Sequence, residues 1–344
     1  MKKQSKLLAL LLACAMTLAL SACGGSSATT STPAGSAAPA ASGSAAATGD
    51  KTYTIGICQL VQHNALDAAT KGFKDALTEK LGDKVKFDEQ NAAGDSATCA
   101  TICNQFVSSK VDLIMANATP ALQAATAATN SIPILGTSVT DYGTALSIAD
   151  WKGTTGTNVT GTADLAPLDK QAEMIKTLFP DKKNVGILYC SAEPNSKYQS
   201  TEITKYLTDA GYTCKEYTFA DSNDVAAVTK TACDESDVIY VPTDNTAASC
   251  AESINNIAEP AKVPIVAGES GICTGCGVAT LSIDYYDLGV VTGNMAYEVL
   301  VNGADPATTE IQFAPKTTYQ YMADRCEKLG VKVPSDYVAI EAEK

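Results

Sequence analysis

Three kinds of functional side chain are nearly absent from this sequence of 344 residues, which has one histidine, His63, one arginine, Arg325, and one tryptophan, Trp151. A zinc site made of three histidines, or of two histidines and a carboxylate, cannot form within such a chain. A bidentate arginine clamp on an anion is disfavoured because the single arginine lies near the C-terminus. A bound anion must therefore be held by lysines, hydroxyl groups or backbone N–H groups.

Positive charge is also scarce. The chain has 25 Lys and Arg residues against 38 Asp and Glu residues, which gives a formal net charge of −13. A nucleic-acid partner needs an excess of cationic surface, so we expect none. The length and the 45% of hydrophobic residues suffice for one large two-lobed unit or for two domains with a core.

No apolar run is long enough to span a bilayer. The longest one, residues 7–20, is shorter than the roughly 20 residues that a spanning helix needs. Three lysines precede it and small residues follow, a pattern typical of a secretion signal over 1–22. The letters LSAC at 20–23 resemble a bacterial lipobox, which implies cleavage before Cys23, lipidation of its sulfur and a lipid-anchored, extracytoplasmic location at the cell membrane. The alternative is an ordinary cleaved signal.

Residues 24–49 are almost wholly Gly, Ser, Ala, Thr and Pro, a composition typical of a flexible linker. After it, the chain repeats one plan. Apolar strands at 53–60 and 184–191 each precede a polar loop and a helix. A buried strand, a loop and a helix of small residues occur at 112–126 and again at 237–251. A strand followed by glycine and polar residues occurs at 132–139 and again at 263–270. The two copies are about 130 residues apart, which indicates an internal duplication.

Alternating strands and helices predict an α/β protein with two doubly wound, parallel-sheet lobes. The chain is expected to cross between them near 157–164, 280–289 and 310–315, which makes a hinge of several crossovers. The expected division is a signal segment 1–22, a lipidated cysteine and linker 23–50, a first lobe of 51–160 with 285–312, and a second lobe of 161–284 with 313–344. Ligands of such sheets bind beyond the carboxyl ends of the strands, so we expect a site between the lobes.

Several stretches of the folded region resemble one family. They are IGICQLVQHNALDAATKGF, ATPALQAAT, GTNVTGTAD, LYCSAEPNSK, VPTDNTAAS and SIDYYDLGVVTGNMAYEVL. Together they are similar to the substrate-binding lipoproteins of ABC importers of the tryptophan/tyrosine-binding type. The resemblance implies a type I periplasmic-binding-protein fold, a small ligand such as an amino acid, and delivery of that ligand to a permease and its ATPase. It does not explain the richness in cysteine.

On the first lobe, Thr119 is predicted to cap a helix with Pro120 at its first position, so that the N–H of Ala121 points into the cleft. With the hydroxyls of Thr137 and Ser138, this helix start is the candidate site for a ligand carboxylate. The alternative is that Thr119 only caps its helix.

On the second lobe, Asp244 is the first candidate for a ligand ammonium group, followed by Asp284 and Glu269. Asp244 could instead cap the helix that begins at DNTAAS, and Glu269 could be a solvated loop charge. Near these residues we place Asn195, Ser196 and Asn245, and His63 and Gln59 face them from the first lobe. The candidate ligand-binding residues are Gln59, His63, Thr119, Pro120, Ala121, Thr137, Ser138, Asn195, Ser196, Asp244, Asn245, Glu269 and Asp284.

Ten cysteines remain after Cys14 in the signal and Cys23. Cys273 and Cys276 form a CTGC loop, and Cys99 and Cys103 lie four apart on a predicted helix. Zinc would need both pairs to meet, so a local disulfide or free thiols are favoured, and no metal or cofactor is expected.

No catalytic residue is expected either, because the sequence has no nucleophile elbow and no phosphate loop. The predicted function is extracytoplasmic binding of a small ligand, with an aromatic amino acid favoured, for an ABC importer. The alternatives are a sugar- or nucleoside-binding protein of the same fold, or a sensor that reports its ligand to a signalling partner.

Overall fold

Residues 51–341 are described by the structure, a computed structural model. The expected signal segment, Cys23 and the whole of the expected linker lie outside these residues. Within 51–341, no helix is both long and apolar enough to cross a membrane.

The first sheet has six parallel strands in the order β11-β5-β4-β3-β1-β2. Its strands are β1 (Tyr53–Gln59), β2 (Val85–Asn91), β3 (Leu113–Asn117), β4 (Ile134–Val139), β5 (Val159–Ala163) and β11 (Gln312–Phe313). Its helices are α1 (Asn64–Leu81), α2 (Ser96–Ser109), α3 (Thr119–Ala128), α4 (Tyr142–Leu146) and α11 (Tyr285–Val301), with a 3₁₀ turn at Gly82–Lys84.

The second sheet has seven strands in the order β13-β12-β10-β9-β8-β6-β7, all parallel to their neighbours except β12 against β10. Its strands are β6 (Asn184–Cys190), β7 (Thr213–Phe219), β8 (Val238–Val241), β9 (Ile265–Ala267), β10 (Ala279–Ile283), β12 (Thr317–Tyr321) and β13 (Val338–Ala339). Its helices are α5 (Leu168–Leu178), α6 (Pro194–Asp209), α7 (Val225–Glu235), α8 (Asn245–Ser249), α9 (Ala251–Ala261), α10 (Ser270–Cys276) and α12 (Ala323–Leu329).

The duplication is visible in the strand orders. The run β2-β1-β3-β4-β5 of the first sheet has the same order as β7-β6-β8-β9-β10 of the second. Strands β1, β3, β4, β8 and β9 are buried along most or all of their length, because helices cover both faces of each parallel sheet. The expectation of two parallel-sheet α/β lobes is confirmed.

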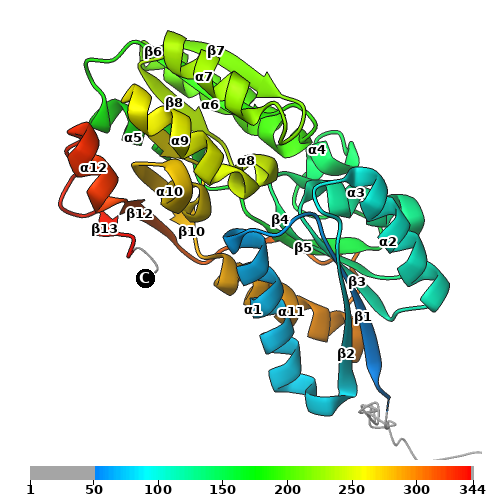
Figure 1. Cartoon of the computed structure of the whole chain (residues 1–344). Helices are drawn as coiled ribbons and strands as arrows, with labels where there is room; N and C mark the ends of the chain where they lie inside the picture. The colour runs from blue at the N-terminus through cyan, green and yellow to red at the C-terminus, as the bar shows by residue number, and fades with distance from the viewer. Residues whose placement is uncertain (1–50, 342–344) are drawn as a thin grey trace, which may run out of the picture. The chain divides into compact units, whose positions relative to one another are not determined.

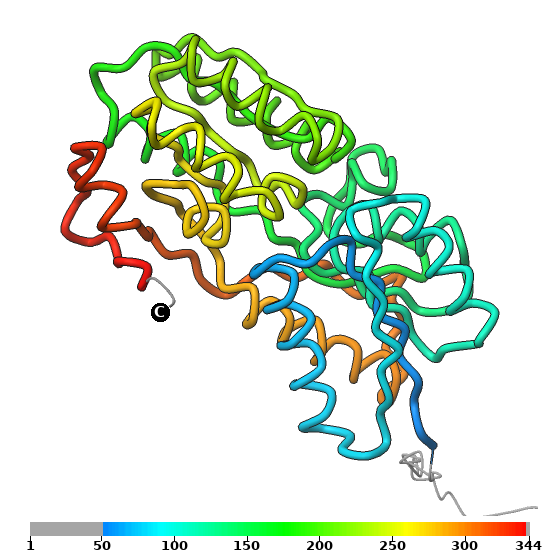
Figure 2. The backbone as a smooth tube through the Cα atoms, in the orientation of Figure 1, coloured from blue at the N-terminus to red at the C-terminus, as the bar shows by residue number. Residues whose placement is uncertain are grey.

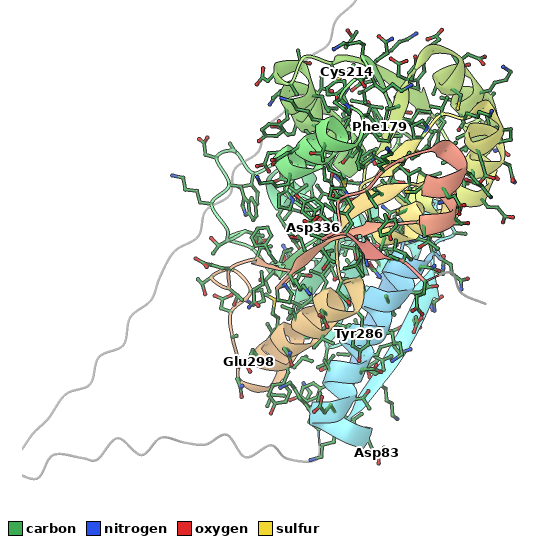
Figure 3. All side chains as sticks on the ribbon, turned by 90° about the vertical axis from the view of Figure 1, so that its left-hand side faces the viewer. Asp83, Phe179, Cys214, Tyr286, Glu298 and Asp336 are labelled. Carbon is green, nitrogen blue, oxygen red and sulfur yellow. The ribbon has the colours of Figure 1, made fainter. Side chains whose placement is uncertain are left out.

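The chain passes between the sheets three times, after β5, after β10 and after β11 (Figure 2). The expected lobe limits at 160 and 312 fall within β5 and β11 rather than after them. After β10 the chain enters α11, which lies side by side with α1 (Figure 1). At this contact the hydroxyl of Tyr286 donates to Asp75, and Figure 3 shows Tyr286 where the two helices meet.

Candidate functional site

The carboxyl ends of the two sheets' strands face one another. Helices α3 and α4 of the first lobe contact α6 of the second, and α1 contacts α10. Two hydrogen bonds cross directly, from Gln199 Nε2 to Thr140 Oγ1 (3.2 Å) and between His63 Nε2 and Asn245 Oδ1 (3.2 Å). The duplicated strand ends therefore face one another across the contact between the lobes.

Buried polar atoms without a hydrogen-bond partner are concentrated at this site. Among residues 51–341 there are ten such side-chain atoms, and five lie at or just beyond the facing strand ends. They are His63 Nδ1, Asn117 Oδ1, Thr119 Oγ1, Ser138 Oγ and Asn195 Oδ1. A buried polar atom without a partner costs about 1–3 kcal/mol, so these five atoms are candidates for hydrogen bonds with a bound molecule.

The start of α3 differs by one residue from the prediction. The cap is Ala118, with φ 90°, and its carbonyl accepts from the N–H of Leu122, so Thr119 is the first helical residue and Pro120 the second. The prediction that Thr119 caps the helix is wrong, because Ala118 takes the extended, positive-φ conformation that turns the chain into α3. The Thr119 hydroxyl is thereby left free, and the buried Ala121 stays in the first turn.

Ser138 in β4 also has a positive φ, 54°. Such conformations are unfavourable for residues other than glycine and persist where the surrounding structure enforces them, often at functional sites. Ala118 directly precedes Thr119, and Ser138 has the second unpaired hydroxyl group. Both strained backbone positions therefore lie at these two hydroxyl groups.

Two predicted ligand contacts are engaged within the first lobe instead. Gln59 donates to Val61 O and Asp67 Oδ1 and accepts from the hydroxyl of Thr70. Thr137 is within hydrogen-bond distance of two other buried threonine hydroxyls, Thr162 on β5 and Thr292 on α11. Their hydrogen bonds join β1 to α1 and β4 to α11, which holds the strand ends in place.

Asp244 caps α8. Its Oδ1 accepts from Ala247 N (2.7 Å), and its Oδ2 accepts from Cys190 N and Ser196 Oγ (both 2.7 Å). Burial, and after it the charge of Glu193, raises the pKa of the Asp244 carboxyl. The carboxylate and the Ser196 hydroxyl are thus engaged within the second lobe, as the helix-cap alternative expects.

Glu193 is a site residue that the sequence reasoning missed. Its carboxylate accepts from the side chain of Asn195 and from the backbone and side chains of Asn245 and Thr246. Since Asn245 donates to Glu193 through Nδ2, its Oδ1 is left to accept from His63. The only signal in the sequence was an acidic residue at the expected start of a helix, in AEPNS.

Of the two remaining acidic candidates, Glu269 is buried and Asp284 is exposed to solvent. Glu269 caps α10 by accepting from the N–H groups of Gly271 and Ile272, and burial raises its pKa while the neighbouring His63 lowers it. The alternative of a solvated loop charge is wrong for Glu269. Asp284 is exposed, caps α11 and lines a separate pocket of about 420 Å³.

Asp164 is the second residue that the sequence reasoning missed. It follows β5, is buried, and accepts from the hydroxyls of Thr140 (3.2 Å) and Tyr285 (2.9 Å). Burial raises its pKa to about 6. Unlike Asp244 and Glu193, it has only these two side-chain donors, so its carboxylate retains acceptor capacity. The signal was present in GTAD, an acidic residue at the carboxyl end of a strand.

The single arginine is engaged elsewhere, as expected. Arg325 donates to the carbonyls of Cys273, Thr274, Gly275 and Gly277 at the end of α10. A cation at a helix C-terminus stabilises it. The CTGC motif lies inside this helix rather than in a loop, because Glu269 caps one end and Arg325 the other.

Comparisons with known proteins show the family of this chain. Residues 54–344 match the family described as ABC transporter substrate binding protein. The chain belongs to this family. The members of this family are transporter substrate-binding proteins and not enzymes, as the sequence predicts.

The substrate-binding protein is 40% identical over 265 residues to a tyrosine-binding protein of Clostridioides difficile, which covers 75% of this chain and 76% of that one. It is 34% identical to a Streptococcus pneumoniae domain in complex with L-Trp, with a TM-score of 0.81, covering 84% and 100% of the two chains. It is 36% identical to a ligand-free, open substrate-binding protein with adhesive properties from Clostridium difficile, with a TM-score of 0.65, covering 85% and 100%.

More distant structures share the fold alone, which is the type I periplasmic-binding-protein fold. A branched-chain amino acid binding protein of Streptococcus pneumoniae matches at 17% identity with a TM-score of 0.56, over 82% of this chain and 98% of that one.

Proposed function

We propose that this substrate-binding protein captures an aromatic amino acid between its lobes and delivers it to an ABC permease and its ATPase. The observation that carries the proposal is the group of five unpaired, buried polar atoms at the facing strand ends. The relatives that bind tyrosine and tryptophan support the class of ligand.

The ligand carboxylate would lie at the start of α3. The hydroxyls of Thr119 and Ser138 supply two donors that have no partner, and the first turn, with the N–H of Ala121, has the positive end of the helix dipole. Pro120 has no N–H and fits this position without loss of a donor. This arrangement replaces the arginine clamp that the chain does not have.

The ligand ammonium group would lie against Asp164. An ammonium group has three donors, and the unpaired Oδ1 atoms of Asn117 and Asn195 are further acceptors at the facing strand ends. We therefore prefer Asp164 to Asp244, whose two carboxylate oxygens already accept three hydrogen bonds.

His63 would select the ligand by accepting a hydrogen bond from its side chain. Because Asn245 Oδ1 is an acceptor, His63 Nε2 carries the hydrogen and Nδ1 is left as a buried acceptor without a partner. A phenol hydroxyl or an indole N–H can donate to it, whereas a benzyl side chain cannot.

The location follows from the sequence pattern. The signal segment and LSAC at 20–23 support a protein anchored through a lipid on Cys23 at the extracytoplasmic face of the membrane. A Cys23→Ala variant should be recovered in the culture medium or soluble extract, whereas the unaltered protein stays with the membrane fraction.

Calorimetric titration tests the ligand proposal. Tyrosine and tryptophan should bind. Tyramine lacks the carboxylate, and 3-(4-hydroxyphenyl)propanoate lacks the ammonium group. Each should bind at least about 10-fold more weakly than tyrosine, which corresponds to a loss of about 1.4 kcal/mol. Glucose and adenosine serve as probes of the sugar and nucleoside alternatives. Binding of either of these without binding of any aromatic amino acid would overturn the proposal.

A further inference from the structure

Three cysteine thiols meet in the core of the first lobe. Cys58 lies in β1, and Cys99 and Cys103 lie one helical turn apart on α2. All three side chains are fully buried, and they belong to the same hydrophobic cluster in the core of the first lobe. The ligand site makes no use of them.

The local packing explains why the sulfur atoms meet. Cys99, Cys103 and Phe106 are spaced four and three residues apart, so they share the face of α2 that covers β1. A Cβ atom on Gly56 would lie 2.6 Å from the Phe106 ring, so the glycine allows α2 to approach β1 closely. Cys58 is two residues beyond Gly56, on the same face of the strand.

The cluster's chemistry is that of thiols and not of a metal site. Among residues 51–341, no group of three or more His, Cys, Asp or Glu side chains is placed to hold a metal ion. All ten cysteines in this range are free thiols in this structure. Hydrogen bonds with Cys103 and Cys99 raise the pKa of Cys58, and the hydrogen bond with Cys58 lowers the pKa of Cys99. The thiolate is the form of a cysteine that attacks a disulfide.

We propose that this cluster is a redox modification site, in which Cys58 forms a disulfide with either of the two α2 thiols. The oxidant is a small disulfide, which reaches the buried thiols when α2 opens locally from β1. A cluster thiolate attacks one of its sulfurs and releases one small thiol, and a neighbouring cluster thiol then loses its proton, attacks the mixed disulfide and releases the second. Two S–H bonds of the protein are replaced by one S–S bond, and the small disulfide is reduced to two thiols.

A bond between β1 and α2 would constrain the strand that ends at Gln59 and leads to His63. It also closes a loop of the unfolded chain, so the oxidised protein should have a higher midpoint of thermal unfolding. Only the encounter with disulfides in the cell rests on the proposed extracytoplasmic location. The reaction of the purified protein does not.

The test is incubation of the full chain with oxidised glutathione, followed by alkylation and peptide mass spectrometry. We expect cross-linked peptides that pair Cys58 with Cys99 or with Cys103. Cys99→Ala and Cys103→Ala should each keep one cross-link, and Cys58→Ala should lose both. No cross-link at Cys58 in the unaltered protein, or a Cys99–Cys103 cross-link in Cys58→Ala, would overturn the proposal.

Cys326→Ala is the matched control, because Cys326 is a buried thiol of the second lobe that donates to Val278 O. Its cross-linking should equal that of the unaltered protein. Circular dichroism and tyrosine titration of each reduced variant report folding and ligand binding separately, so a failure of the proposed function stays distinct from a failure of this inference. If Cys58→Ala does not fold, Cys58→Ser preserves the side-chain size and removes the sulfur.

Discussion

At the scale of single residues, the carboxyl groups of the site differ in how many hydrogen bonds they accept from their neighbours. Asp244 accepts hydrogen bonds from two backbone N–H groups and a hydroxyl, and Glu193 from five donors, whereas Asp164 accepts from two hydroxyl groups. The first two hold the second lobe's loops together. Asp164 is the carboxylate with capacity for a ligand cation.

Ligand affinity should depend on pH through Asp164. Burial raises the pKa of this carboxyl to about 6, and an ammonium ligand requires the ionised form. Below pH 6 the ligand must displace a proton, so affinity should fall by up to about 10-fold per pH unit, and above pH 7 it should be constant. Titration of tyrosine between pH 4.5 and 8 measures this.

Asp164→Asn removes both the charge and the pH dependence. A charge-assisted hydrogen bond contributes about 1.5–3 kcal/mol, so affinity at pH 7.5 should fall by about 10- to 150-fold and vary little between pH 5 and 8. Asp83→Asn is the control, since Asp83 is exposed at the far end of α1 (Figure 3). Unchanged affinity in Asp164→Asn would assign the ammonium group to another residue.

Asp244→Ala should destabilise the fold. The variant removes a helix cap, about 1 kcal/mol, and leaves the buried N–H of Cys190 without its acceptor, a further 1–3 kcal/mol or so. Urea unfolding should therefore show a loss of about 2–4 kcal/mol. Full stability together with lost binding would support the sequence-based hypothesis that Asp244 contacts the ligand.

At the scale of elements, the first lobe depends on the contact between α1 and α11. A Cβ atom on Gly72 would lie 2.1 Å from the carbonyl oxygen of Tyr286, and one on Gly289 would lie 2.0 Å from that of Ala69. Two helix backbones can come this close only where glycine replaces larger residues. The contact brings α11, which follows the crossover from the second lobe, onto α1, whose start has His63 as its cap.

Gly289→Ala should separate these helices. The added methyl group meets backbone and not a movable side chain, and overpacking of this kind typically costs about 1–3 kcal/mol. Thermal unfolding should show a lower midpoint than in Asn294→Ala, an exposed position of the same helix. Equal midpoints for the two variants would mean that the helices can move apart without cost.

At the scale of the whole molecule, the structure is more similar to a relative in complex with L-Trp than to a ligand-free, open one. The TM-score is 0.81 with the L-Trp complex and 0.65 with the ligand-free, open relative, although the identities, 34% and 36%, are nearly equal. The bonds from Gln199 to Thr140 and between His63 and Asn245 join the lobes directly in this structure. These two hydrogen bonds hold the lobes against one another.

Gln199→Ala should shift the ligand-free protein toward the open form. Small-angle X-ray scattering should show a larger radius of gyration than in the unaltered protein without ligand, and the same radius at saturating ligand. The affinity for tyrosine should fall in proportion to the decrease in the fraction of closed molecules. Gln123→Ala is the control, because Gln123 donates to Ala145 O within the first lobe. An unchanged radius in Gln199→Ala would show that this bond does not support closure.

Much of the fold could be predicted because it depends on local patterns. Apolar strands such as 53–60 and 184–191 alternate with helices, and this alternation, repeated about 130 residues later, indicates two parallel sheets and a site between their strand ends. Motif resemblance supplied the family. These signals are carried by residues near one another in the chain, where spacing reports structure directly.

The sequence by itself determined the class of fold and the family, and it indicated the part of the molecule that we propose binds a ligand. Only the tertiary structure decided which polar residues there are free to bind it. Asp244 and Asp164 both follow buried strands, yet the first is occupied by N–H and hydroxyl groups brought in by β6 and α6, and the second is not. A side chain's role depends on how many hydrogen bonds its neighbours already make to it, and those neighbours are distant in the chain.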